Sequence, residues 1–223
     1  IQPLAPRYAT DPGEFTAPGF QRWTRTWCVD FASTQEIYWN EDGDKIDIGD
    51  LPSRAFDSPR QREQTAALLE DYNLHTSVTP LLDARFAALA EDRVHANPWR
   101  YYLGLPIARV ADMWFRPRFE GLPIDERWWV YSENHAVTIF GYAYAALNLA
   151  MVLAAVAGLF LRPQYAGALI LYLLLRSTLL ATIEAPETRY TLECLPMIIA
   201  LASVALARIG TRMTANAATL ISS

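Results

Sequence analysis

The pattern of apolar and polar residues changes near residue 135. Three long apolar stretches follow that point, at about 136–161, 165–183 and 191–207. The first contains no charged residue, the second contains Arg176 alone, and the third contains Glu193 alone. A helix needs about 20 apolar residues to cross a hydrocarbon layer ~30 Å thick. The pattern therefore predicts an all-α membrane protein with three transmembrane helices joined by short loops.

The first 134 residues show helical periodicity in a more polar segment. Aromatic residues recur mostly at steps of three and four, which is the spacing of one face of an amphipathic helix. They are Phe20, Trp23, Trp27, Phe31 and Tyr38. The acidic, glycine-containing stretch NEDGDKIDIGDLP at 40–52 then breaks this helix.

Three pairs of a capping residue and a proline mark further helix starts. They are Ser58-Pro59, Thr79-Pro80 and Asn97-Pro98. The side chains of Ser, Thr and Asn accept hydrogen bonds from the first turn of a helix, and proline fits the first helical position. We predict helices from 59 to about Tyr72, from 80 with an apolar face, and from 98. The face of the second helix consists of Leu82, Phe86 and Leu89, and Pro106 should kink or interrupt the third helix.

Charge separates the same two parts of the chain. Residues 1–135 contain 14 of the 19 basic and 21 of the 24 acidic residues. This acidic balance argues against a nucleic-acid partner, because phosphate binding requires clustered Lys and Arg. Eighteen basic residues are Arg and one is Lys45, a preference that we interpret as compositional. We divide the chain into an acidic helical segment at 1–97, an interfacial stretch at 98–134, and the transmembrane helices with a short tail at 135–223.

The stretch before the first apolar segment, DMWFRPRFEGLPIDERWWVYSEN at 112–134, mixes aromatic residues with arginines. This combination is typical of segments in the headgroup layer of a bilayer. We expect it to anchor at the membrane surface. Arg116 and Arg118 are candidates for contact with an anionic lipid or a phosphate.

The sequence contains no recognisable motif for a metal, a cofactor or a nucleophile. The acids of EDGDKIDIGD do not fall in the register of an EF-hand loop, so we interpret this stretch as a solvated turn. His75 and His95 lie near predicted helix ends, and no nucleophile can be paired with them. Cys28 and Cys194 are the two cysteines, and we expect both to be free thiols. We expect no metal, no cofactor and no catalytic residue in this chain.

Acidic residues reappear at one bend, EAPETRYTLECLP at 184–196. After His135 the acidic residues are Glu184, Glu187 and Glu193. A charge in the hydrocarbon layer costs about 2.5–3.5 kcal/mol and usually faces a partner or a cavity. We therefore expect an ion pair between Arg176 and Glu193 that ties the last two spans together.

Several motifs resemble bacterial PMT-like membrane glycosyltransferases, the glycosyltransferase family 39 type with the GT-C fold. In that family a Glu-x-Arg-Tyr motif at the extracytoplasmic end of a late span precedes an apolar helix with Leu and Pro. The stretch ETRYTLECLPMIIALASVAL matches it through Glu187, Arg189, Tyr190 and Pro196. The stretches PGFQRWTRTW, LPSRAFDS and NPWRYYLGLPIARVADMWFRPR are similar to the C-terminal region of one bacterial subgroup. The resemblance covers nearly the whole chain.

The resemblance implies transfer of a sugar from a polyprenyl-phosphate lipid donor to an extracytoplasmic acceptor. It implies a multi-pass protein of the plasma (inner) membrane, with residues 1–134 outside and the C-terminus in the cytoplasm. The donor phosphate would be bound by Arg189, Tyr190 and Arg176, and Glu187 would hold the Arg189 side chain in place. The acids would orient arginines and not act as a general base.

The resemblance also implies a catalytic Asp in the first extracytoplasmic loop of the full-length protein, and this chain has no such region. The chain begins at Ile1 with the turn-rich stretch IQPLAPRYATDPGEF. We therefore expect it to be the C-terminal part of a longer protein. Its partners would be the lipid bilayer, the sugar donor and the N-terminal transmembrane part, and the fragment alone should be inactive.

Other classes of protein stay open at this point. The apolar stretches could be helices of a large soluble core, although such helices rarely run uncharged for so long. Arg176 could line the pathway of a transporter or channel subunit, although the inverted repeats and broken spans typical of transporters are not visible. The chain could also be a non-catalytic membrane scaffold whose acidic segment binds a partner protein.

Overall fold

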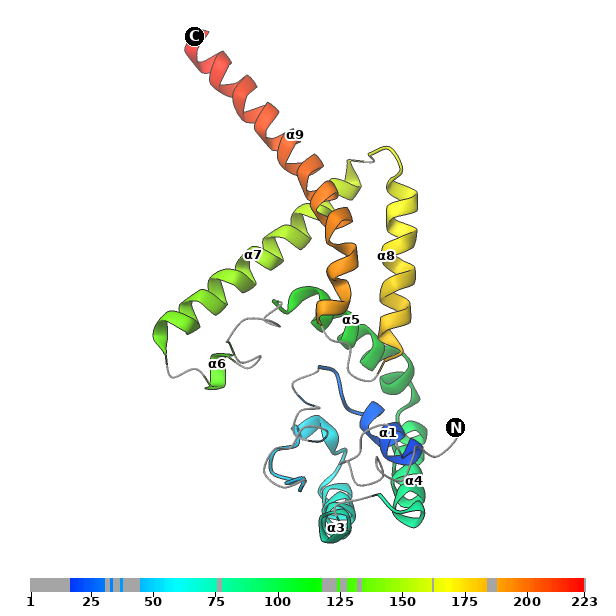
Figure 1. Ribbon diagram of the computed structural model, residues 1–223. Coiled ribbons are helices and arrows are strands. Elements are labelled where there is room, and N and C mark those ends of the chain that lie inside the picture. The colour runs from blue at the N-terminus through cyan, green and yellow to red at the C-terminus, as the bar shows by residue number, and fades with distance from the viewer. Residues whose placement is uncertain are drawn as a thin grey trace. The chain divides into compact units, whose positions relative to one another are not determined.

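The computed structural model contains helices and no strand in the residues that it describes (Figure 1). These residues are 17–30, 33, 37, 45–75, 78–117, 124, 128–131, 134–161, 163–183 and 188–222. The predicted all-α class is therefore confirmed for this part of the chain. The chain forms two compact units, and the division between them falls inside helix α5 (Leu105–Phe115). The first unit comprises Ile1–Val110 and Ala181–Glu187, and the second comprises Ala111–Leu180 and Thr188–Ser223.

The first unit contains two helices of equal length that begin where the sequence predicts. The helix α3 (Pro59–His75) is preceded by Ser58, whose hydroxyl accepts a hydrogen bond of 3.2 Å from the Gln61 N–H. The helix α4 (Pro80–Ala96) is capped by Thr79, whose hydroxyl accepts from the Leu82 N–H at 3.2 Å. Both predicted helix starts are confirmed. They could be predicted from the sequence because capping depends on residues only three positions apart.

The aromatic face near the N-terminus forms a shorter helix than predicted. The helix α1 (Pro18–Arg25) ends before Trp27, and Phe31 and Tyr38 lie outside the described residues. Phe20, Trp23 and Trp27 are nevertheless fully buried. The Phe20 ring meets that of Phe86 on α4 edge to face, with centroids 4.9 Å apart. These rings form the core of the first unit, together with Tyr72 of α3.

A π turn precedes Pro106, where the sequence predicts an interruption of the helix. This turn, η3 (Arg100–Gly104), runs directly into α5 through a hydrogen bond from the Leu105 N–H to the Arg100 carbonyl. Proline has no N–H to continue an α-helical ladder, and a π turn is one way in which a helix accommodates that loss. A short 3₁₀ helix, η2 (Ser53–Ala55), completes the described helices of this unit.

The second unit contains the apolar helices. They are α7 (His135–Phe160), α8 (Ala166–Ala181) and α9 (Leu195–Ser222), with the short helix α6 (Trp128–Tyr131) before α7 and the 3₁₀ helix η4 (Thr188–Cys194) before α9. The α7 and α9 helices pack against each other (Figure 1). Ala155 faces Leu201 and Ala202 in this contact. Small side chains allow close approach of helix backbones in a membrane.

Two helices in the described part of the chain are long and apolar enough to cross a membrane, over His135–Phe160 and Arg189–Arg212. Only 22% and 28% of their most apolar 18-residue stretches are buried by protein, so most of their apolar surface is uncovered. The stretch predicted as a further span at 165–183 forms α8, which has 16 residues. At 1.5 Å per residue α8 extends about 24 Å, which is short of a hydrocarbon layer of ~30 Å. Three transmembrane helices are therefore not confirmed.

Candidate functional site

Arg189 and Tyr190 of the Glu-x-Arg-Tyr motif lie in η4, directly before α9. Arg189 is exposed, and Tyr190 beside it is half-buried. The guanidinium carbon of Arg189 lies 5.9 Å from the centre of the Tyr190 ring, within the range of a cation–π interaction. Glu187, which the sequence places in the same site, lies outside the described residues. The turn thus presents one arginine on an aromatic support.

Arg176 of α8 pairs with Glu193 of η4, as the sequence predicts. The Arg176 Nη2 lies 3.2 Å from the Glu193 Oε2. The Arg176 side chain is 26% exposed, whereas that of Glu193 is 63% exposed. The Nε of Arg176 is buried and has no hydrogen-bond partner among the described residues. The pair links α8 to the turn that carries Arg189 and leaves one N–H of Arg176 unused.

Arg116, a predicted contact for lipid headgroups, is held by protein atoms. Its Nη2 and Nε donate to the Asp112 Oδ1 at 2.7 and 3.0 Å. Its guanidinium carbon also lies 5.9 Å from the ring centre of Trp129. Arg118 lies outside the described residues. The headgroup role of both arginines stays a prediction.

A polar contact that the sequence analysis missed lies where α5 ends in the second unit. The side-chain amide of Asn148, midway along α7, donates to the carbonyl oxygens of Trp114 at 3.0 Å and Phe115 at 3.3 Å. The Trp114 Nε1 donates to the Ser177 hydroxyl of α8 at 3.0 Å. A single Asn in an otherwise uncharged apolar run was the available signal, because polar side chains at such positions usually serve a partner.

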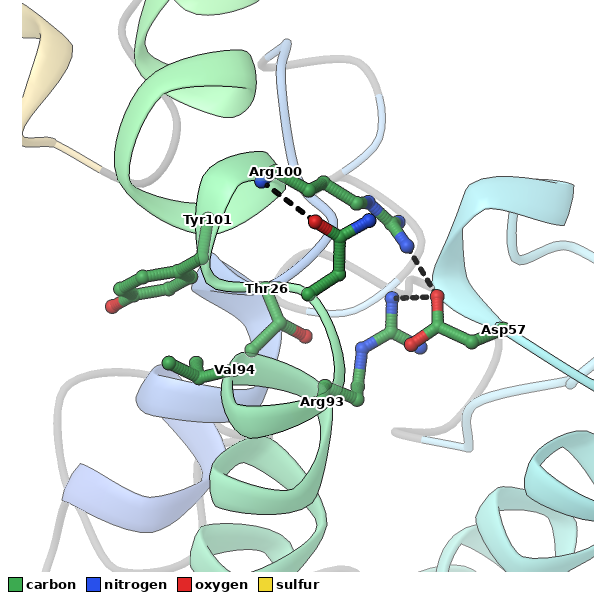
Figure 2. A pocket seen from close by; sticks show the side chains of 7 residues that line it. Thr26, Asp57, Arg93, Val94, Arg100 and Tyr101 are labelled. Carbon is green, nitrogen blue, oxygen red and sulfur yellow. Dashed lines mark hydrogen bonds and ion pairs between the residues drawn. The ribbon is translucent and has the colours of Figure 1, made fainter.

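A second cluster, in the first unit, centres on the buried arginine Arg93 of α4 (Figure 2). Arg93 and Arg100 converge on the carboxylate of Asp57, and the Arg93 Nη2 lies 3.3 Å from the Asp57 Oδ1. Arg93 also donates to the carbonyl of Ala55 and to that of Arg54, the latter at 3.1 Å. Arg100 donates to the same Arg54 carbonyl at 2.7 Å. The two guanidinium groups thus fasten η2 and the start of α3 to the end of α4 and to η3.

Burial lowers the pKa of Arg93 to about 10; the positive charge of Arg100 adds to this, and Asp57 opposes it. The side chain therefore remains protonated at neutral pH. An arginine that keeps its proton cannot act as a general base under these conditions. The cluster is suited to holding carbonyl and carboxylate groups in place.

The pocket beside this cluster is small. Its volume is about 10 Å³, close to the minimum for a single water molecule. It is lined by Thr26, Asp57, Arg93, Val94, Asn97, Arg100 and Tyr101 (Figure 2). A sugar or a phosphate group does not fit inside it, so the pocket is a less suitable ligand site than η4.

Two further arginines of the first unit also bind backbone carbonyls. Arg54 donates to the Trp27 carbonyl at 3.2 Å and pairs with Asp30 at 2.7 Å. Arg109 donates to the carbonyls of Cys28 and Arg25. These arginines are thus used structurally, and the interpretation of the chain-wide preference for Arg as compositional stays a prediction. Guanidinium groups offer five donors in a rigid fork, and an ammonium group does not.

The described part of the chain shows no cluster of side chains that could bind a metal ion. Cys28 and Cys194 are both buried, and neither forms a disulfide. His95 is exposed near the end of α4.

Comparison with known proteins adds no relative. Neither a scan against protein-family models nor searches of curated proteins and of solved structures finds a match for this chain. The glycosyltransferase interpretation therefore rests on the motif residues and on the geometry of η4.

Proposed function

We propose that this chain is the C-terminal portion of a membrane glycosyltransferase and that η4 binds the phosphate of a polyprenyl-phosphate-linked sugar. The observation that carries the proposal is the exposed Arg189, held over the Tyr190 ring on a turn directly before a helix long and apolar enough to cross a membrane. A lipid-linked phosphate must be bound where its isoprenoid tail is in hydrocarbon and its sugar is in water. An arginine at the end of such a helix meets both requirements.

The chemistry of the donor explains why arginine suits this position. Loss of the sugar leaves an additional negative charge on the lipid phosphate, and charge-assisted hydrogen bonds from arginine stabilise that charge in a poorly hydrated site. Arg189 supplies this contact, and the Tyr190 hydroxyl adds a hydrogen bond to the phosphate. Glu187, as the resemblance implies, orients the Arg189 fork.

Arg176 supports the same site at greater depth. Its charge is balanced by Glu193, and a phosphate that replaces Glu193 in this pair would accept from the Arg176 Nη2. This role is secondary, because the ion pair already engages one end of its guanidinium group.

The proposal includes an orientation in the plasma membrane. Residues 1–134 lie on the extracytoplasmic side, and Arg208 and Arg212 near the end of the last apolar helix lie in the cytoplasm, so the proposal includes a crossing by the short helix α8 between α7 and α9. Cytoplasmic ends of spans carry an excess of arginine and lysine, and no acidic residue follows Glu193. The catalytic Asp that the resemblance implies matches no residue of this chain, so the proposal assigns donor binding to it and not proton transfer.

Sugar transfer by the parent protein in proteoliposomes tests the proposal. The assay follows radiolabelled sugar from a panel of polyprenyl-phosphate donors and compares Arg189→Ala, Glu187→Gln and the unchanged protein. Loss of a donor to developing negative charge costs on the order of 100-fold or more in rate, and we expect a loss of that size for Arg189→Ala. Arg208→Ala serves as the control, because Arg208 is an exposed arginine further along α9.

The outcomes separate the possibilities. Loss of transfer in both Arg189→Ala and Glu187→Gln, with normal insertion and an active Arg208→Ala, supports a donor site. Full transfer by Arg189→Ala reduces η4 to a structural bend. No transfer by the unchanged protein with any donor removes the main support for a glycosyltransferase and favours a transporter or scaffold.

A further inference from the structure

The helical stretch at 99–107 in the first unit exposes its apolar side chains. Trp99 is 74% exposed, Tyr102 64%, Leu103 49% and Ile107 65%. We call these four residues the aromatic stripe. In a water-soluble protein an amphipathic helix turns such residues inward, so this stretch has the opposite arrangement.

The other side of the same stretch is fixed to the first unit by arginines. Arg109 is 4% exposed, and its Nη2 donates to the Arg25 carbonyl at 2.7 Å and to the Cys28 carbonyl at 2.9 Å. Arg100 pairs with Asp57 and donates to a carbonyl of η2. Leu105, which lies between Arg100 and Arg109 in the sequence, is buried. These bonds set the rotation of the helix, so the stripe cannot turn into the core of the first unit.

The π turn η3 brings the ends of the stripe into line. On a regular α-helix, Trp99 and Ile107 are eight residues apart and point about 80° away from each other. A π turn takes up one residue more than an α turn, so the eight residues span about two full turns. Trp99, Leu103 and Ile107 then lie on one face, with Tyr102 on the flank of this face. The turn therefore has a consequence beyond the accommodation of Pro106: it produces one continuous apolar surface.

We propose that the aromatic stripe docks into the headgroup layer of a lipid bilayer. Trp and Tyr are enriched at this depth because their rings are apolar and carry one polar group. The stripe contains one of each and no charged residue. The helix that carries it also ends in the apolar part of the chain, where Asn148 of α7 binds the carbonyls of Trp114 and Phe115. Ile107 precedes Phe115 by eight residues in the sequence.

This surface differs from the arginine contacts expected for the interfacial stretch. The arginines of the helix at 98–115 bond to protein carbonyls and carboxylates, and the exposed side chains of the aromatic stripe remain for the lipid. Membrane contact by the stripe depends on the apolar helices but not on sugar transfer. It would hold whether the protein is a transferase, a transporter or a scaffold.

Lipid quenching of a fluorophore on the stripe tests the proposal. The full chain is reconstituted in phosphatidylcholine–phosphatidylglycerol vesicles with an NBD label on Leu103→Cys. Leu81→Cys is the matched control, because Leu81 on α4 is also apolar and is 73% exposed. Leu147→Cys on α7, 65% exposed, provides the comparison for an apolar helix. The unsubstituted chain, whose two thiols are buried, serves as the labelling blank.

We expect the label at 103 to shift its emission to the blue and to be quenched by spin-labelled lipid, as at 147. The label at 81 should be quenched by iodide in the water and not by the lipid. Quenching at 103 by iodide to the same extent as at 81 would show a solvated stripe and overturn the proposal. Shielding at 103 from both quenchers would also overturn it, because a second copy or another protein surface would then cover the stripe.

Discussion

The side-chain amide of Asn148 lies 3.0 Å from the carbonyl oxygen of Trp114 and donates a hydrogen bond to it. Asn148 is midway along α7, and Trp114 is in the last turn of α5. The final carbonyls of a helix have no partner within that helix. In hydrocarbon such groups need protein partners, so Asn148 allows α5 to end beside an apolar helix.

Replacement of Asn148 by Leu should destabilise the second unit. The change leaves the carbonyls of Trp114 and Phe115 without this donor, and a polar contact of this kind in a membrane is worth about 1–2 kcal/mol. Unfolding in mixed micelles with rising SDS measures the effect. Leu147→Ala, one residue away on an exposed position, should change the free energy of unfolding by less than about 0.5 kcal/mol. Equal stability of both variants would mean that the hydrogen bond contributes nothing.

Replacement of Arg93 by Met should destabilise the first unit much more than a surface change. Arg93 is 4% exposed and binds two carbonyls and the carboxylate of Asp57. Removal of one member of a buried charged network costs about 3–5 kcal/mol. Arg85→Met breaks an ion pair with Asp71 whose side chains are 45% and 40% exposed, and such pairs contribute under about 1 kcal/mol. Near-UV circular dichroism of the Trp23–Trp27 cluster during denaturation measures the free energy of unfolding of both variants. Similar losses of stability in Arg93→Met and Arg85→Met would contradict a structural role for Arg93.

The stability difference caused by Arg93→Met should be the same at pH 6 and pH 8. Burial lowers the pKa of Arg93 to about 10, so as the pH rises the folded protein loses this proton before the unfolded chain, in which the pKa of the arginine is higher. The cost of the buried charge is therefore fully present below about pH 10, and it falls above pH 10 as the folded state loses the charge. Parallel denaturation curves at the two lower pH values check this. A difference between them would assign the effect to another titrating group.

Local signals in the sequence predicted local structure, and the arginine contacts show why the rest was not predicted. Ser58 and Thr79 act on N–H groups three residues away, so capping was visible in the sequence. Arg109 instead binds a carbonyl 84 residues away in the chain. A carbonyl is present at every residue, so the sequence holds no signal for which one an arginine will find.

The contacts of the apolar helices in the second unit were also predicted only in part. Arg176 and Glu193 are single charges in neighbouring apolar stretches, and their pairing followed from the cost of isolated charge in hydrocarbon. Helix ends were harder, because hydropathy continues through Thr182 and Ile183 whereas α8 ends at Ala181. Asn148 was overlooked because a single amide does not lower the hydropathy of a long apolar run.

Replacement of Gly158 by Ala should disrupt the packing of α7 on α9. A Cβ atom at Gly158 would lie 1.9 Å from the carbonyl oxygen of Leu201, so the helices would have to separate. Overpacking of this kind costs about 1–3 kcal/mol. Gly167→Ala on α8 is the matched control, because a Cβ there meets nothing within 4 Å, and higher helix propensity should stabilise it by up to about 1 kcal/mol. In SDS, the free energy of unfolding should fall for Gly158→Ala and rise for Gly167→Ala. A change in the same direction for both variants would contradict the close approach of α7 and α9.

Replacement of Glu193 by Gln should strengthen binding of a lipid phosphate at η4. Glu193 balances the charge of Arg176 in the structure, so its neutralisation leaves Arg176 available beside Arg189. The Glu193 side chain is 63% exposed, and a pair of this kind is worth up to about 1 kcal/mol, which corresponds to at most about a fivefold gain in affinity. Titration with polyprenyl phosphate in vesicles measures this gain, and added salt should reduce it because screening weakens the attraction.

Glu91→Gln on α4 controls for the change in net charge, because it removes one exposed acid in the first unit. A gain in affinity for Glu193→Gln alone supports a role for Arg176 in phosphate binding. The same affinity in both variants would restrict Arg176 to joining α8 with η4. A loss of affinity in Glu193→Gln would mean instead that the ion pair positions the turn, since Arg189 could then bind phosphate only while Glu193 holds Arg176.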